Sequence, residues 1–343
     1  MTSPHSTLHS DGLTLVTGAT GLLGSTLTRL LVERGAAVRI LRRESSQTDL
    51  LGHAADAVEH VFGDVTDPAT LAAAFEGVTH VYHTAAGLGT GRPSDRRTLH
   101  AVNVVGTRNV VDAALRASVR RLVHTSSMAA FGRPEASGAE DAPLDERSEW
   151  TASRLNGPYA ESKYLSELEV QRGVAEGLDA VLVNPALIFG VGRPGENTVQ
   201  IVEMVRDGRM PAVPTGGTNV VDVLDVADGH LRAMDYGHTG ERYFLGSENL
   251  RWREIVGALA GALGVDPPRR TASPLASLAL AVLAEGAARL TGTAPKLTRE
   301  RARQTAAFYR YTNARAANDL GCTFRPFAET ARRVAAAFGK AGR

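Results

Sequence analysis

The sequence has very little cysteine and no excess of charge of one sign. Its 343 residues contain one cysteine, Cys322, which excludes a disulfide framework and a thiolate metal site and fits a reducing compartment. The formal net charge is +1, so the charge balance gives no indication of nucleic acid or an acidic membrane surface as a partner. We therefore expect a cytoplasmic protein that binds neither.

Long hydrophobic runs are also lacking. The most apolar stretch, from Pro274 to Ala284, is much shorter than the ~20 residues that cross a bilayer, so we expect a buried or lid helix there and no membrane span. Residues 1–10 are polar and lack the apolar segment of a signal peptide. The closest histidine pair, His80 and His83, lies in a strand-like stretch where residues three apart point to opposite faces, and we predict no metal site.

Lysine is rare, which gives weight to the places where it occurs. The chain has 38 lysines and arginines together, of which only Lys163, Lys296 and Lys340 are lysines. Lys163 follows Tyr159 at the four-residue spacing that places two side chains on one face of a helix. A phenol has an ordinary pKa of about 10, and a neighbouring ammonium favours the phenolate, so this pair suits proton transfer near neutral pH. The alternative is a surface helix on which the two residues are unrelated.

The first half of the chain alternates short apolar runs with amphipathic stretches. Such alternation is typical of an α/β fold with a doubly wound parallel sheet of the Rossmann type, covered by helices on both faces. The predicted strands are 13–17, 37–41, 57–62, 80–84, 121–125 and 180–183, and the predicted helices are 22–33, 69–75, 98–117 and 159–176. Between the last two helices, residues 132–157 are predicted to form a long loop.

The second half of the chain changes character after Pro185. We predict a Rossmann domain over residues 11–185, completed by about 218–247, where strands at Val220–Leu224 and Arg242–Leu245 would return to the sheet. A smaller, mostly helical substrate lobe would be formed by 186–217 and 248–340. Its predicted helices are 197–206, 252–264, 274–290, 297–307 and 327–339.

The first predicted strand runs into a glycine-rich turn, Thr17-Gly-Ala-Thr-Gly-Leu-Leu-Gly24, that opens a helix. In this context Gly18 permits the tight turn, Gly21 lets the backbone approach a pyrophosphate, and Gly24 lets the helix pack closely on the strand. The phosphates would meet the amides at the helix N-terminus. The sequence therefore predicts a dinucleotide site formed by Gly18, Thr20, Gly21, Leu22, Leu23 and Gly24.

The end of the second strand indicates which dinucleotide binds. In NAD-binding versions a carboxylate about 20 residues beyond the glycines bonds the ribose 2′-hydroxyl. Here the strand ends in Arg42 and Arg43, whose guanidinium groups suit a 2′-phosphate, and we predict NADP(H). The alternative is that both arginines are solvated and Glu44 contacts the ribose. Further cofactor contacts are predicted after the third and fourth strands, from Asp64, Val65, Thr84, Ala85 and Ala86.

The fifth strand ends in Thr125-Ser-Ser127, at the sheet edge where ligands of open α/β folds bind. With the glycine turn and Tyr159-x-x-x-Lys163, this segment makes about residues 12–235 resemble the extended short-chain dehydrogenase/reductase family, within the NAD-dependent epimerase/dehydratase superfamily. The chain is most similar to its dihydroflavonol-reductase-like and hydroxysteroid-dehydrogenase-like group. The other matching segments are 63–65, 102–107, 184–185 and 221–226.

The resemblance implies roles for individual residues. Tyr159 would donate a proton to the substrate oxygen, and Lys163 would hold the nicotinamide ribose and lower the pKa of Tyr159. The second serine after the fifth strand, Ser127, would be the catalytic serine, and Asn103 would support a water relay or the active-site helix. Pro185 would lie beside the nicotinamide. The implied activity is reduction of a carbonyl group by NADPH, and the implied assembly is a homodimer.

Other activities occur on the same fold. Sugar-nucleotide dehydratases carry an Asp-Glu pair just after the catalytic serine or threonine, whereas this chain has Met128 and Ala129, which cannot transfer protons. A sugar-nucleotide epimerase with tightly bound NAD(P) is the alternative, and a regulatory protein that binds NADP without chemistry is a third hypothesis. Apolar residues between 187 and 213 favour a small hydrophobic ketone as substrate, while Arg193 and Arg209 are candidates to bind an anionic group.

Overall fold

The computed structural model describes residues 12–89, 95–135, 143–291, 295 and 297–339. Its main sheet has seven parallel strands in the order β3-β2-β1-β4-β5-β6-β9. These strands are β1 Leu13–Thr17, β2 Ala37–Arg42, β3 Glu59–Phe62, β4 Val78–His83, β5 Arg121–Thr125, β6 Ala180–Pro185 and β9 Arg242–Leu245. The doubly wound α/β fold predicted from the sequence is confirmed.

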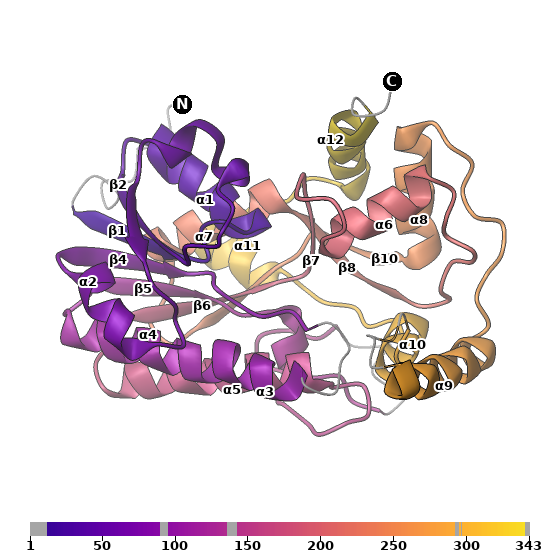
Figure 1. Cartoon of the computed structure of the whole chain (residues 1–343), viewed down its shortest axis with the longest axis horizontal. Helices are drawn as coiled ribbons and strands as arrows, with labels where there is room; N and C mark the ends of the chain where they lie inside the picture. Colours follow the sequence, from indigo (N-terminus) through magenta and orange to yellow (C-terminus); the bar gives the residue numbers. More distant parts are fainter. Residues whose placement is uncertain (1–11, 90–94, 136–142, 292–294, 296, 340–343) are drawn as a thin grey trace.

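Each face of the main sheet has its own core, because successive residues of a strand point to opposite faces. Leu15 and Leu122 pack into a cluster with the helices α2 Leu71–Phe75, α4 Gly106–Arg116 and α5 Pro158–Ala175. Their neighbours Val16 and Val123 pack into a second cluster with α1 Leu22–Glu33, α7 Val223–Tyr236 and α11 Ala314–Leu320. Figure 1 shows the sheet between α1 above and α4 and α5 below. Burial on both faces explains why the inner strands β1 and β6 are mostly apolar along their length.

The predicted helix over 98–117 is present, but it is not a uniform α-helix. The chain passes from α3 Asp95–Leu99 through a π-helical stretch, His100–Val105, into α4. Widened turns of this kind are frequent at functional sites. This one carries Asn103, whose side chain is buried.

A smaller lobe follows β6 and contains a second, three-stranded sheet in the order β10-β8-β7. Its strands are β7 Leu187–Phe189, β8 Gly217–Asp222 and β10 Glu248–Arg251, and its helices are α6 Asn197–Arg206, α8 Trp252–Leu263, α9 Pro274–Thr291, α10 Arg299–Ala306 and α12 Phe327–Gly339. The five predicted lobe helices are confirmed. In Figure 1 the lobe lies to the right of the main sheet.

One strand prediction is wrong. Val220–Leu224 was expected to return to the main sheet, but β8 pairs with β7 and β10 in the small sheet, and the chain is helical from Val223 onward. Only β9 returns, beside β6. The apolar run of β8 has the same appearance in either sheet, since all six of its residues are buried, so the sequence pattern could not distinguish them.

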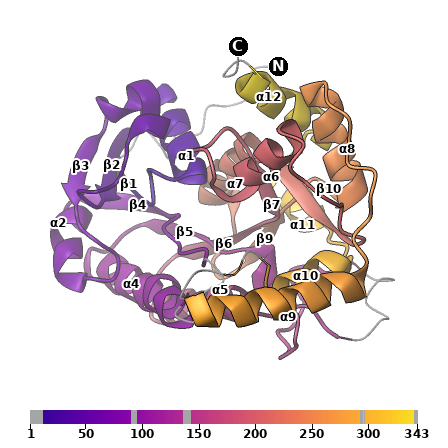
Figure 2. The ribbon, with the colours of Figure 1, turned by 45° about the vertical axis from the view of Figure 1, so that its right-hand side comes forward.

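The apolar helix α9 is largely exposed, so the buried helix, one of the two alternatives predicted for that stretch, is wrong, and the lid helix stays a prediction. Leu275 and Leu283 are 80% and 71% exposed, whereas Ala281 is fully buried. Figure 2 shows α9 beside α10 along the lower side of the molecule. Within the residues that the structure describes, no helix has the length and apolar character needed to cross a membrane.

Candidate active site

The glycine turn between β1 and α1 is tightly packed at two of its three glycines. Gly18 has φ of +71°, and a methyl group on it would lie 2.6 Å from the Ala85 amide nitrogen. A methyl group on Gly24 would lie 2.2 Å from the Gly18 carbonyl oxygen. Thr84 holds the two loops together, since its hydroxyl donates to the Thr17 carbonyl at 2.7 Å. Thr84 and Ala85, two predicted cofactor contacts, therefore also support the turn.

Gly21 differs, because the protein does not fill the space that its side chain would occupy. A methyl group there would meet only the Gly18 carbonyl oxygen, at 3.5 Å. Gly21 is also the N-cap of α1, whose first turn has no acidic residue and no side-chain cap. For the amides of Leu22, Leu23 and Gly24 the described structure gives no acceptor. An open backbone surface with free amides at a helix N-terminus fits a pyrophosphate.

Substitution of Gly21 tests this assignment. We expect Gly21→Ala to weaken NADPH binding at least tenfold, about 1.4 kcal/mol, because the methyl group would stand where the phosphates approach. Its φ of −83° is accessible to alanine, so the midpoint of thermal unfolding should barely change. The matched variant Gly24→Ala should lose stability instead, because its methyl group meets backbone. Fluorescence titration with NADPH and thermal unfolding separate the two; unchanged affinity in Gly21→Ala would contradict the assignment.

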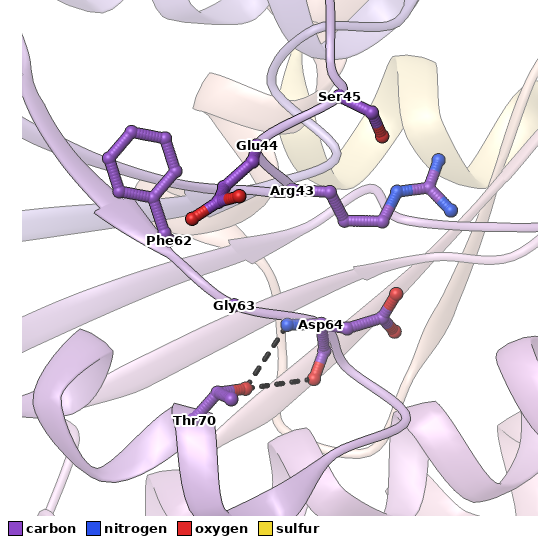
Figure 3. Close-up of a pocket in the computed structure, with 7 residues that line it drawn as sticks. All are labelled: Arg43, Glu44, Ser45, Phe62, Gly63, Asp64 and Thr70. Atoms are coloured by element: carbon purple, nitrogen blue, oxygen red, sulfur yellow. Dashed lines mark hydrogen bonds between the residues drawn. The ribbon is translucent and has the colours of Figure 1, made fainter.

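The pocket at the ends of β2 and β3 contains the predicted specificity residues (Figure 3). A hollow of about 480 Å³ is lined by Arg43, Glu44, Ser45, Phe62, Gly63, Asp64 and Thr70. The guanidinium of Arg43 is exposed and extends away from Phe62 in the figure. Arg42 is already engaged, since its Nε donates to His60 Nδ1 at 2.8 Å and its guanidinium lies 4.4 Å from the centre of the Phe62 ring. Arg43 is thus the better placed of the two for a ligand.

The other predicted cofactor contacts lie at the same sheet edge. Asp64 Oδ1 accepts from the amide and the hydroxyl of Thr66, and this turn fixes the carboxylate beside the pocket. Val65 is buried and its carbonyl accepts from the Asn109 side chain. Ala86 follows Ala85 in the segment after β4. The Thr20 carbonyl accepts from Arg193 Nη1 at 3.0 Å.

The two arginines considered for an anionic substrate group are bound to protein carboxylates instead. Arg193 binds Asp49 Oδ1 through Nε and Nη2, and Arg209 binds Asp207. Arg193 comes from the loop after β7, so its bonds to Asp49 and to the Thr20 carbonyl fasten the lobe to the glycine turn. The predicted substrate role of these two residues has no support from their geometry.

Tyr159 and Ser127 meet at the carboxyl end of β5. Tyr159 lies in the first turn of α5, which Gly157 and Pro158 begin, and Ser127 caps the short 3₁₀ turn Met128–Phe131. Burial raises the pKa of Tyr159, and the Ser127 side chain opposes the rise. The phenol therefore stays protonated at neutral pH and has a polar partner at its oxygen.

Lys163 follows one turn along α5 and is 1% exposed. Its ammonium donates to the Thr125 carbonyl at 2.8 Å. Burial lowers the pKa of Lys163 to about 8, and the Glu167 carboxylate opposes that effect. Burial is the largest influence on the pKa of Tyr159, and the Lys163 ammonium donates to the backbone of β5, so the lowering of the Tyr159 pKa by Lys163 stays a prediction.

Asn103 links the active-site helix to the segment after β4. Its amide oxygen accepts from the Gly87 amide at 2.7 Å, and its nitrogen donates to the Gly87 carbonyl and to the Ser162 hydroxyl. Ser162 in turn donates to the Tyr159 carbonyl. These bonds use both ends of the Asn103 side chain and match the second of its two expected roles, support of the helix.

The adjacent serine, Ser126, points away from the phenol and donates to Glu167 at 2.5 Å. Asn184 Nδ2 donates to the same carboxylate at 2.6 Å and to the Ser127 carbonyl at 3.0 Å. Pro185 ends β6 and is buried beside this group. Glu167 is absent from the sequence prediction, although its spacing of four residues from Lys163 on a predicted helix was a usable signal.

Comparison with known proteins agrees with this geometry. A model described as the NAD dependent epimerase/dehydratase family matches residues 14–246. The chain belongs to this family. It is an NAD(P)-dependent oxidoreductase that acts on hydroxyl or carbonyl groups. In the described part of the chain, no cluster of three or more His, Cys, Asp or Glu could hold a metal ion.

Similar family members include a putative dihydroflavonol 4-reductase from Synechocystis sp., 34% identical over 312 residues that cover 89% of this chain and 88% of the relative. Sterol demethylase protein B from Methylococcus capsulatus is 40% identical over 276 residues, 79% of this chain and 80% of the relative. Among solved structures, the crystal structure of gox2253 superposes with a TM-score of 0.81 at 35% identity, covering 96% of this chain and 99% of that one.

Proposed function

We propose that this protein is an NADPH-dependent reductase that delivers hydride to the carbonyl carbon of a small hydrophobic substrate, with Tyr159 as the proton donor. The proposal depends above all on one observation. At the carboxyl end of β5 the Ser127 side chain acts on the ionisation of the Tyr159 phenol, and Lys163, one helical turn along α5, donates to the Thr125 carbonyl at 2.8 Å. Ligands of open α/β sheets bind at this edge, and the glycine turn lies along it.

The chain's own residues would position the reactants and supply the proton. Bound NADPH would provide the hydride. Ser127 would hold the substrate oxygen beside Tyr159, which gives up its phenolic proton as that oxygen becomes negative. The raised pKa of Tyr159 suits a donor, because the phenol enters the reaction protonated. The Lys163 ammonium would favour the phenolate that remains and would hold the nicotinamide ribose.

The preference for NADPH rests on Arg43. Its exposed guanidinium lies at the edge of a pocket that Asp64 also lines, where a 2′-phosphate could accept two charge-assisted hydrogen bonds. Arg42, held by His60 and Phe62, would form the wall behind it. Glu44 also lines this pocket, so a cofactor without the phosphate would find an acceptor for its ribose hydroxyl there.

The substrate class is inferred from the lobe and from the relatives. Dihydroflavonol and sterol, the compounds in the names of two relatives, are largely apolar. Leu187 and Ile188 lie just beyond β6 and are partly buried, so they leave apolar surface near the reaction centre. Phe189 and Val213 belong to the core of the lobe. Part of the apolar character of that segment therefore serves the packing of the lobe and does not indicate a substrate site.

The reaction should depend on pH through Lys163. Its pKa of about 8 means that the ammonium is lost progressively above that pH. Because the charged form would hold the ribose and offset the phenolate, we expect kcat/KM for ketone reduction to be constant near pH 7. Above about pH 8 it should fall tenfold per pH unit. A pH profile at saturating NADPH and low ketone measures this; a plateau that extends to pH 10 would show that Lys163 charge is not required.

The test of the function is whether NADPH is consumed in proportion to a ketone. We expect purified protein with a panel of aromatic and alicyclic ketones to oxidise one NADPH per alcohol formed. A sugar-nucleotide epimerase would instead retain bound NAD(P) without net consumption and interconvert its substrate. Retained cofactor together with epimerisation of a nucleotide sugar would replace the present proposal with that alternative.

A further inference from the structure

Glu167 is a buried carboxylate that the reaction above does not use. It lies on α5, one turn beyond Lys163 and two beyond Tyr159, and is 4% exposed. Glutamate is almost never fully buried unless it is paired. Burial raises its pKa, while Ser126, Arg242, Asn184 and Lys163 all act in the opposite direction.

The Glu167 carboxylate accepts hydrogen bonds from residues at the ends of three strands. Oε1 accepts from the Ser126 hydroxyl after β5 at 2.5 Å and from Asn184 on β6 at 2.6 Å. Oε2 accepts from Arg242 on β9 at 3.4 Å. Every partner donates, so the group acts as an ionised acceptor. Asn184 also donates to the Ser127 carbonyl. The hydrogen-bond network of Glu167 therefore includes the residue that acts on the Tyr159 phenol.

The negative charge of the same carboxylate raises the pKa of Lys163, against the effect of burial. The lysine itself donates to the Thr125 carbonyl, the residue directly before Ser126. Glu167 therefore acts on two parts of the site. Its charge acts on the Lys163 ammonium. Its hydrogen bonds act on Ser126 directly and on Ser127 through Asn184. Removing one member of a buried charge pair leaves the other uncompensated.

We propose that Glu167 is a positioning residue for the reaction, which supplies the counter-charge for Lys163 and fixes the Ser126–Ser127 segment so that Ser127 meets Tyr159. This inference rests on the proposed function of those three residues. It assigns to Glu167 no contact with substrate or cofactor, so its effects are expected on the ionisation of Lys163 and on the placement of Ser127.

The other ionisable groups around this cluster do not titrate in the relevant range. His83 on β4 and His230 on α7 have pKa values of about 3 and about 4 because they are buried. Burial and the neighbouring Lys163 hold the pKa of His124 on β5 well below its ordinary value. Glu146 faces the Phe244 amide on β9. An alkaline transition near pH 8 is therefore assigned to Lys163.

The scarcity of lysine gives a direct readout that requires neither substrate nor cofactor. With three lysines in the chain, protein labelled with ¹³C-lysine has three side-chain Cε resonances, which Lys296→Arg and Lys340→Arg assign by elimination. In the wild type the Lys163 resonance should titrate near pH 8. In Glu167→Gln, which keeps the shape but loses the charge, we expect the midpoint to fall by about one unit or more.

Activity should change in a matching, pH-dependent way. At pH 8, Glu167→Gln should lose roughly fivefold in kcat/KM, and at pH 6 it should lie within about threefold of the wild type, because the midpoint moves by about one unit. Glu167→Asp keeps the charge but retracts the carboxylate from Ser126 and Asn184. It should keep the Lys163 midpoint and lose kcat roughly tenfold or more through misplacement of Ser127. Glu169→Gln, an exchange two residues along the same helix, is the control and should change neither quantity.

The outcomes separate this inference from the proposed function. If wild-type protein reduces no ketone, or Tyr159→Phe remains active, the function fails whatever the lysine titration gives. If the function holds but Glu167→Gln titrates and reacts as Glu169→Gln does, the role of Glu167 is overturned. Should Glu167→Gln not fold, Glu167→Asp decides, since wild-type kcat in that variant would equally overturn the role.

Discussion

Tyr159→Phe is expected to lower kcat by about 10²- to 10⁴-fold, the range over which general acid catalysis contributes to enzyme rates. The variant removes the hydroxyl that would protonate the substrate oxygen and leaves the ring in place. NADPH affinity should change less than about threefold, since the phosphate and ribose contacts come from the glycine turn, Arg43 and Lys163 (about 0.65 kcal/mol for a threefold change). Steady-state kinetics and fluorescence titration with NADPH measure both quantities.

A matched control exists on the same helix. Tyr164 lies five residues further along and stacks on Trp150 with ring centres 4.7 Å apart, away from Ser127. Tyr164→Phe should leave kcat within about twofold, because no reacting group touches its hydroxyl (about 0.4 kcal/mol). Activity of Tyr159→Phe within tenfold of the wild type would rule out the proton-donor role and with it the mechanism proposed here.

Arg43→Ala is expected to reduce the preference for NADPH over NADH by roughly 10- to 100-fold. Hydrogen bonds to charged groups contribute about 1.5–3 kcal/mol each, and a 2′-phosphate left facing the pocket without its guanidinium would lose them. NADH makes no such contact, so its kcat/KM should stay nearly constant. The ratio of kcat/KM values for the two cofactors, with one ketone, is the measurement.

Two further variants refine this result. Arg43→Lys keeps the charge but loses the forked geometry, and it should recover only part of the NADPH preference. Arg42→Ala should cost stability as well as affinity, because Arg42 binds His60 and covers Phe62. Equal losses with NADPH and NADH in Arg43→Ala would mean that the pocket does not recognise the 2′-phosphate and would favour Glu44 as the ribose contact.

Much of the main sheet could be predicted from the sequence, and the physical reason is its burial on both faces. Runs such as Leu13–Thr17 and Ala180–Pro185 are mostly apolar and almost fully buried because helices cover both sides. The pairing of the lobe strand β8 with β7 and β10 could not be predicted in the same way. The residues of β8 are as buried as those of the main sheet, and partner choice depends on contacts far away in the sequence.

Those parts of the site could be predicted in which the chemistry requires a fixed spacing of residues along the chain. The four-residue spacing of Tyr159 and Lys163 and the three glycines of the turn are local patterns, and the structure brings each set together. What stayed hidden depends on residues distant in sequence. The role of Glu167 depends on its hydrogen bonds to Ser126, Asn184 and Arg242, which come from three different strands. Arg193 and Asp49, which bind each other, are 144 residues apart in the sequence.

The most direct test of the account follows the hydrogen atoms of the reaction. Protein is incubated with a reactive ketone and NADPH in which both hydrogens at C4 of the nicotinamide are deuterium, and the alcohol is analysed by mass spectrometry. The account predicts one deuterium on the carbinol carbon of each product molecule, a matching loss of NADPH, and loss of the signal in Tyr159→Phe. Product without deuterium, or cofactor that is never consumed by any ketone while a nucleotide sugar is epimerised, would contradict it.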